Sequence, residues 1–215
     1  MDYQETFAPV AKMNTMRILL YLAAHFDSNL HQFDVKNAFL HGEIDEEIYM
    51  EVSPGFGASL DKNKVCRLKK ANYGLKQSLR IWFGRFTRVM LSVGCKQSQG
   101  DHTLFIKHFD SGRVTTLLVY VDDIIMIRND PKEKEALWQC LAKEFEIKDL
   151  RKLKYFLRIE VAWSKKGIFV SQHKYILDLL KETGKLGCKP IETPIEANHK
   201  LGEALEDKGV DRGMH

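Results

Sequence analysis

The sequence predicts an α+β fold in which helices pack on one face of a mostly antiparallel sheet, of the split βαβ kind. Two observations lead to this expectation. Segments with helical and with strand periodicity follow one another in the order helix, strand, helix, hairpin, helix, hairpin. A central apolar run over 114–127 has two short halves rich in β-branched or aromatic side chains, which is typical of two buried antiparallel strands.

Periodicity and breakers give the bounds of the elements. The first helix is expected over 14–26, where apolar residues recur at helical spacing and Asn14 or Thr15 can cap the start. A second helix over 78–93 ends at Gly94, and a third begins at Pro131. The other predicted elements are strands at 30–35, 48–52, 65–68 and 103–109, a Pro-Gly loop at 54–57, a hairpin at 155–163 and 167–171, and a helix at 172–183.

Composition excludes several classes of protein. Hydrophobic residues make up 44% and charged residues 29%, which is ordinary for a globular domain. The four cysteines form no C-x-x-C pair, which argues against a zinc module and fits a reducing compartment. There is no signal peptide and no apolar run of bilayer length, so we expect an intracellular protein of the cytoplasm or nucleus, not secreted and without a membrane partner. The net charge of +4 permits a polyanionic partner.

Three aspartates are candidate metal ligands. Asp122 and Asp123 stand at the expected turn of the central hairpin, and Asp34 lies near the end of the strand at 30–35. Adjacent carboxylates repel each other and stay ionised beside a cation, most often Mg²⁺. Asp-Asp alone also suits a plain polar turn, so both interpretations stay open at this point. If the two strands are neighbours, the three carboxylates meet at one edge and can hold two Mg²⁺ about 3.5–4 Å apart.

Five blocks in a fixed order resemble the reverse transcriptase of copia-type LTR retrotransposons. They are DYQETFAPVAKMNTMRILL, HQFDVKNAFLHGEIDEEIYM, VCRLKKANYGLKQ, LLVYVDDIIMI and KYFLRIEV, and the match runs from Asp2 to about Leu201. The resemblance implies the palm of a right-hand polymerase plus part of the fingers over 1–188. The segment 189–215 would be a disordered tail at the start of the thumb region. It also implies an RNA or DNA template-primer and deoxynucleotides as partners, and two Mg²⁺ ions, with Mn²⁺ as a substitute.

The resemblance also assigns roles to single residues. Asp34, Asp122 and Asp123 would be catalytic and bind metal. Phe39 would be a steric gate against a ribose 2′-OH, although plain core packing also explains a phenylalanine there. The other assignments are Asn37, Ala38, Tyr73, Gly74, Gln77 and Tyr120 to substrate binding, and Phe156, Leu157 and Arg158 to the primer grip. Tyr73 is equally explained as a packing residue.

The chain departs from the family pattern at four internal places. Ser78-Leu79 replaces Ala-Pro, Ile127-Arg128 replaces Thr-Gly, Arg158 replaces Gly, and Asn72 replaces Leu. We expect strain at Arg128 if that glycine had positive φ. At Arg158 a long cation either obstructs a close backbone approach or binds a phosphate.

The ends of the chain also bear on the hypothesis. A family strand with Lys and Arg for the triphosphate would precede Asp2, and the thumb and RNase H would follow His215, so both are expected to be absent. Three hypotheses remain: an RNA-directed DNA polymerase domain, a truncated and inactive remnant that at most binds nucleic acid, and a product that does not fold stably.

Overall fold

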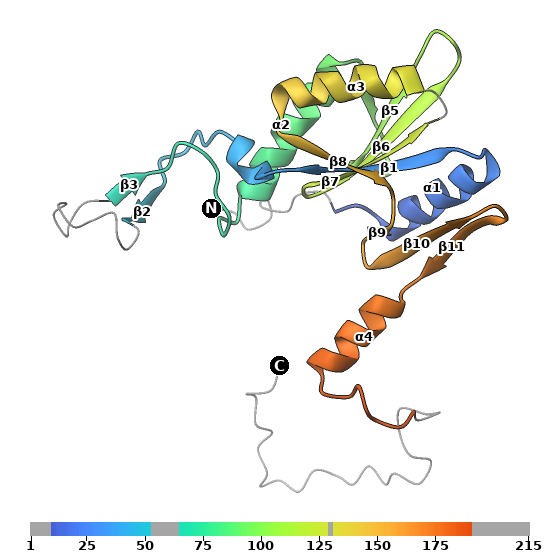
Figure 1. Cartoon of the computed structure of the whole chain (residues 1–215). Coiled ribbons are helices and arrows are strands. Elements are labelled where there is room, and N and C mark those ends of the chain that lie inside the picture. Colours follow the sequence, from blue (N-terminus) through green and yellow to red (C-terminus); the bar gives the residue numbers. More distant parts are fainter. Residues whose placement is uncertain (1–9, 53–64, 129–130, 191–215) are drawn as a thin grey trace, which may run out of the picture. The chain divides into compact units, whose positions relative to one another are not determined.

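The computed structural model describes residues 10–52, 65–128 and 131–190, and the chain divides into two compact units, residues 1–172 and 173–215. A six-stranded antiparallel sheet with the order β4-β5-β6-β7-β1-β8 forms the centre of the first unit (Figure 1). The expected antiparallel sheet is therefore confirmed. Its strands are β1 (Asn29–Val35), β4 (Lys96–Gln97), β5 (Leu104–His108), β6 (Val114–Tyr120), β7 (Asp123–Arg128) and β8 (Ile147–Lys152).

Helices α2 (Ser78–Ser92) and α3 (Pro131–Glu144) cover one face of this sheet. We call the side chains between them and the sheet the first core. It joins one face of the central strands to aromatic residues of α2, among them the fully buried Trp82 and Phe86. Its sheet side chains are Phe33, Val35, Phe105, Leu117, Val119, Ile124 and Met126.

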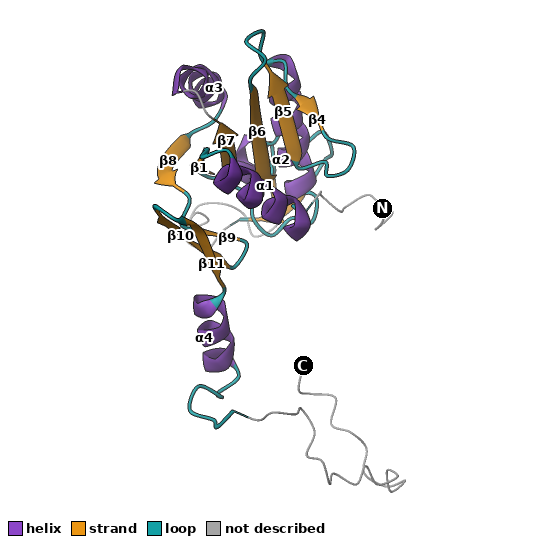
Figure 2. Cartoon of the chain, turned by 90° about the vertical axis from the view of Figure 1, so that its right-hand side faces the viewer, coloured by secondary structure: helices purple, strands orange, loops and turns teal. Residues whose placement is uncertain are grey.

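The opposite face is covered as well, by helix α1 (Met13–His25) and a small three-stranded sheet (Figures 1 and 2). That sheet consists of β9 (Tyr155–Phe156), β10 (Ile159–Ser164) and β11 (Gly167–Ser171). The second core lies here, and its members from the large sheet are Leu30, Leu118, Ile125 and Ile127. The prediction of helices on one face is therefore wrong for α1. The reason is that β6 and β7 carry apolar residues at consecutive positions, so both of their faces need cover.

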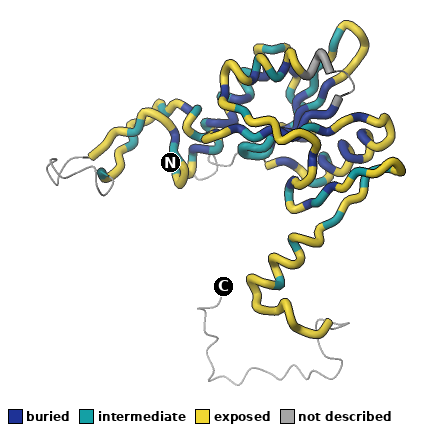
Figure 3. The backbone as a smooth tube through the Cα atoms, in the orientation of Figure 1, coloured by how far each residue is buried: buried dark blue, intermediate teal, exposed yellow. Residues whose placement is uncertain are grey.

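Two described parts contribute little to either core. The ribbon of β2 (Tyr49–Glu51) and β3 (Val65–Arg67) is exposed throughout (Figure 3). In the second unit, α4 (His173–Glu182) has a strongly apolar side but no buried residue. The predicted Pro-Gly loop at 54–57 lies outside the described residues, as does the predicted tail beyond residue 190. Among the described helices, none is long and apolar enough to cross a membrane.

Strand β8 was not predicted. Its sequence, IKDLRK, lacks an apolar alternation, and the residues from Lys148 to Lys152 are all exposed. The segment becomes a strand because it pairs with β1, and a register shift opposite Gln32 and Phe33 interrupts the pairing. Arg151 has a φ of 68°, and its N–H donates to Asp149 Oδ1 at 2.6 Å. Such an irregular, charged edge resists pairing with a further strand.

Helix α1 begins at Met13, one residue before the predicted start, and neither Asn14 nor Thr15 is its N-cap. The buried Asp101, distant in the sequence, holds this end of the helix instead. One carboxylate oxygen accepts from the Lys12 N–H at 3.1 Å and the Thr15 hydroxyl at 2.6 Å, and the other from the N–H and hydroxyl of Thr103. Burial alone would raise the pKa of Asp101, but these hydrogen bonds outweigh it and hold the pKa below its ordinary value.

We expect Asp101→Asn to lower the free energy of unfolding by about 2–4 kcal/mol, since a buried network loses its charged acceptor. Because the folded-state pKa of Asp101 is depressed, the unfolded chain takes up the proton first as pH falls. The deficit should be present at neutral pH, above the ordinary aspartate pKa of about 3.9, and shrink as the pH falls through the folded-state value. Urea unfolding across pH checks this, with the exposed Asp110→Asn as the matched control. Equal stability of Asp101→Asn and parent at neutral pH would contradict it.

Candidate active site

A row of side chains crosses four neighbouring strands at one end of the large sheet. Asp123 of β7 is paired with Tyr120 of β6 on one side and with Asp34 of β1 on the other. Asp34 is in turn paired with Lys148 of β8. Directly opposed residues share a face of the sheet. The strand register therefore brings Asp34 beside the acidic hairpin, as the sequence predicted.

Asp122 lies in the turn beside this row, and its carbonyl accepts the Val35 N–H at 2.8 Å. Together with Asp34 and Asp123 it forms an acidic edge. Burial raises the pKa of Asp34, and the charge of Asp122 raises it further, while Lys148 and Lys36 oppose the change. Burial also raises the pKa of Asp123; a hydrogen bond from Gln32 lowers it, and Asp122 and Asp34 raise it. The three carboxylates therefore repel one another.

The chemistry of this edge fits a hard divalent cation, because carboxylate oxygens are its usual ligands and a cation relieves their repulsion. The arrangement of the side chains, however, does not form a complete metal site. Within the described residues, no group of three or more His, Cys, Asp or Glu side chains is arranged to hold one ion. The donor set thus fits a metal by type and charge, without forming a three-ligand cage.

The turn that carries Asp122 is strained and is held from outside. Val121 has a φ of 55°, which is unusual for a β-branched residue. The Trp82 indole of α2 donates to the Val121 carbonyl at 2.7 Å, and Trp82 is fully buried in the first core. The helix therefore fixes the peptide next to Asp122.

The chain leaves β1 through a tight turn into the short 3-10 helix η2 (Ala38–His41). Asn37 has a φ of 51°, which asparagine tolerates better than most residues, and Ala38 is buried. Phe39 is half-buried against the first core, and its ring lies 4.7 Å from that of Tyr73. Gly42 lets α2 approach closely, since a Cβ there would stand 2.6 Å from Ile81 Cγ2.

The segment from Asn72 to Ser78 forms turns that lead into α2. Gly74 has a φ of 90°, and Tyr73 is 54% exposed, so packing alone does not account for this tyrosine. Two departures from the family pattern meet here, because the buried Ser78 hydroxyl donates to the Asn72 carbonyl at 2.6 Å.

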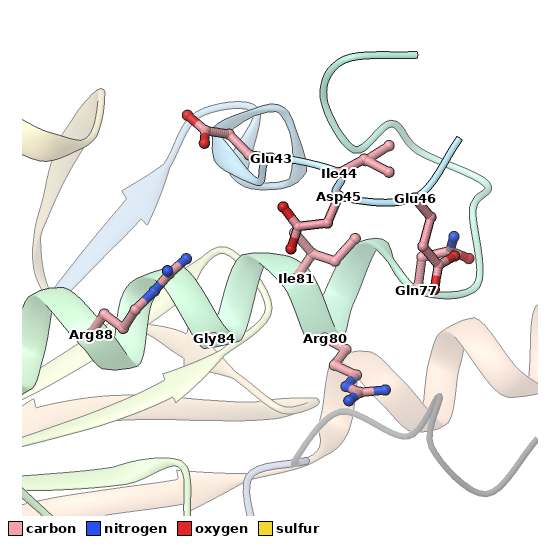
Figure 4. A pocket seen from close by; sticks show the side chains of 9 residues that line it. All are labelled: Glu43, Ile44, Asp45, Glu46, Gln77, Arg80, Ile81, Gly84 and Arg88. Atoms are coloured by element: carbon pink, nitrogen blue, oxygen red, sulfur yellow. The ribbon is translucent and has the colours of Figure 1, made fainter. Parts of the chain in front are cut away.

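Gln77 also lines a separate hollow of about 510 Å³ between the loop at 43–46 and α2 (Figure 4). Glu43, Asp45 and Glu46 come from the loop, and Arg80 and Arg88 from the helix. None of the three aspartates of the acidic edge lines it. Its charges are mixed, so it does not by itself indicate a site for a polyanion.

Two of the three predicted primer-grip residues, Leu157 and Arg158, form the turn between β9 and β10, and Phe156 is the last residue of β9, paired with Ile159. Phe156 is buried, and its ring meets that of Tyr120 edge-on at 6.1 Å. Leu157 has a φ of 48° and Arg158 one of 65°, a turn geometry that favours Asn-Gly. Arg158 therefore carries backbone strain at the position where the resemblance implies glycine. Arg128 of β7, the other position at which strain was expected, is paired with Asn29 of β1 and is not among the described residues with positive φ.

Three residues of this region were not singled out from the sequence: Gln32, Trp82 as a hydrogen-bond donor, and Lys148. Gln32 donates to Asp123, Trp82 donates to the carbonyl of Val121 beside Asp122, and Lys148 is paired with Asp34. Only Gln32 could have been suspected from the sequence, because it is a polar residue in a predicted strand, two positions before an aspartate.

The protein class follows from comparison with known sequences. Residues 1–197 match the family described as reverse transcriptase (RNA-dependent DNA polymerase), and the chain belongs to it. It is 39% identical over 218 residues to the Retrovirus-related Pol polyprotein from transposon RE1 of Arabidopsis thaliana. It is 40% identical over 222 residues to that from transposon RE2 of the same plant, and 36% over 215 residues to that from transposon TNT 1-94 of Nicotiana tabacum.

These alignments cover 100%, 100% and 97% of the chain, but only 15%, 15% and 16% of the relatives. The expected kinship with copia-type Pol polyproteins is confirmed. No solved structure matches the chain.

We expect Arg158→Gly to raise the free energy of unfolding by about 0.5–1 kcal/mol. Relief of the positive φ, worth about 1–2 kcal/mol, exceeds the added entropy of the unfolded chain. Thermal or urea unfolding measures this. Lys154→Gly is the matched control, because this nearby exposed cation is not among the described residues with positive φ, and the change should destabilise. A loss of stability in Arg158→Gly would show that the arginine side chain outweighs the strain.

Proposed function

We propose that this chain is the RNA-directed DNA polymerase domain of a retrotransposon, which transfers a nucleotide from a dNTP to a primer 3′-OH. In this reaction the primer oxygen forms a bond to the α-phosphorus, and the bond from that phosphorus to pyrophosphate breaks. The pairing of Asp34 with Asp123, with Asp122 in the adjoining turn, carries the proposal. Membership of the reverse transcriptase family supports it.

The three carboxylates are proposed to hold two divalent ions, Mg²⁺ or Mn²⁺. Such ions lower the pKa of the attacking hydroxyl and neutralise charge on the leaving pyrophosphate. The carboxylates are suited to this because they are half-buried and repel each other. Trp82 would keep the turn of Asp122 in place during the reaction through its bond to Val121.

Phe39 is proposed to exclude a ribose 2′-OH, with Asn37 and Ala38 beside it and Tyr73, Gly74 and Gln77 near the nucleotide. The contact of the Phe39 ring with Tyr73 supports this assignment, because it joins the two predicted substrate segments. Tyr120 and the turn at Phe156, Leu157 and Arg158 are proposed to receive the primer. Their support is the contact between the Tyr120 and Phe156 rings next to the acidic edge.

A second candidate function is nucleic-acid binding without catalysis. Two observations favour it: the absence of a three-ligand group among the described residues, and the strained Arg158 in the expected primer grip. In this case the template-primer would bind, but no nucleotide would be added.

Primer extension on an oligo(dT)-primed RNA template with Mg²⁺ or Mn²⁺ tests the proposal. We expect the parent chain to extend the primer and Asp122→Asn to lose at least about 99% of the extension, because an ionised ligand is removed. The exposed Asp110→Asn serves as the control and should extend like the parent. Extension by Asp122→Asn at the parent rate would contradict the assignment of Asp122 as a metal ligand. Absence of extension by folded parent that still binds the template-primer would favour the second candidate.

The same assay with ribonucleotides tests Phe39. We expect Phe39→Val to raise the use of rNTPs relative to dNTPs by about 10-fold or more, since the clash with the 2′-OH is relieved. Its unfolding midpoint should be compared with that of the parent, because Phe39 also packs on the first core. An unchanged dNTP/rNTP ratio in the folded variant would make Phe39 a packing residue.

A further inference from the structure

Gln32 is a polar side chain in an apolar setting. It lies on β1 two residues before Asp34, on the same face of the sheet, and is only 8% exposed. Its register partner on β7 is Ile125, whose own partner on β6 is Leu118, and both belong to the second core. A buried amide at such a position costs stability unless it is hydrogen-bonded.

The amide makes that hydrogen bond across the strands. Gln32 Nε2 donates to Asp123 Oδ1 at 2.9 Å, although the register partner of Asp123 is Asp34. The contact is therefore diagonal, over a span that a long side chain can bridge. It engages one oxygen of the carboxylate and fixes the rotation of the group at the start of β7.

We propose that Gln32 is a positioning residue that orients the Asp123 carboxylate toward a divalent cation; this inference rests on the metal-binding role in the proposed function. A donor behind a ligating carboxylate sets its direction before the cation arrives. Removal of such an outer partner typically weakens metal binding about 10- to 100-fold.

The packing of the strand does not need the amide. A methionine has nearly the same length and volume, and would extend the apolar surface formed by Leu118 and Ile125. Gln32→Met removes only one partner of the hydrogen bond, but the Asp123 carboxylate is half-buried, so water can replace the amide and the cost in stability is small. The positioning role thus predicts a large loss of metal binding with little change in stability, which a purely structural role does not.

The test measures binding of Mn²⁺ to the full chain without nucleic acid, by the paramagnetic resonance signal of free Mn²⁺, together with the melting temperature. We expect Gln32→Met to weaken Mn²⁺ binding about 10-fold or more and to melt close to the temperature of the parent. Gln97→Met is the matched control, since the Gln97 amide donates instead to the His102 carbonyl, and it should bind Mn²⁺ like the parent.

The Asp123→Asn variant distinguishes a failure of the proposed metal site from a failure of the positioning role of Gln32. If Asp123→Asn leaves Mn²⁺ binding unchanged, the metal site itself is wrong and the role of Gln32 falls with it. If Asp123→Asn loses Mn²⁺ while Gln32→Met binds it like the parent, only the positioning role is overturned. A Gln32→Met protein that melts well below the parent would also overturn it, by making the amide a requirement of the fold.

Discussion

Electrostatic repulsion among the carboxylates of Asp34, Asp122 and Asp123 is a cost that the surrounding strands, turn and helix must offset. The antiparallel pairing of β1 with β7 sets Asp34 opposite Asp123, and the turn before β7 brings Asp122 beside them. Burial and their mutual charge raise the pKa values of Asp34 and Asp123, so the folded chain keeps these groups together at a cost in stability. Clusters kept together at such a cost are concentrated at functional sites, and for this reason we propose the acidic edge as the active site.

Contacts from both faces of the sheet hold these carboxylates in place. On the face of the first core, Trp82 of α2 donates to the carbonyl of the strained Val121. On the face of the second core, Gln32 donates to Asp123, and the Phe156 ring contacts the Tyr120 ring. The acidic edge is thus fixed from both faces of the sheet. A sheet covered on one face only would leave either the turn or the carboxylate of Asp123 without its partner.

Much of this fold could be predicted from local patterns. The four long helices and the strands that contain Asp34 and Asp123 follow from periodicity, and the three aspartates from the motif blocks. Strand β8 could not be found, because IKDLRK is a strand only through its pairing with β1. The covering of both faces was missed, and so were the contacts of Gln32 and Trp82, since they join residues about 90 and 40 positions apart. The positive φ of Val121 likewise contradicts the preference of valine, and only the tertiary hydrogen bond explains it.

Carbon-13 NMR titration of the aspartate carboxyl groups tests whether these carboxylates repel one another and share a cation. Without metal, we expect apparent pKa values of Asp34 and Asp123 above the ordinary value of about 3.9, and a fall of both on addition of Mg²⁺. Ordinary pKa values for Asp34 and Asp123 that do not respond to Mg²⁺ would contradict the account, because the carboxylates would then neither repel one another nor share a cation.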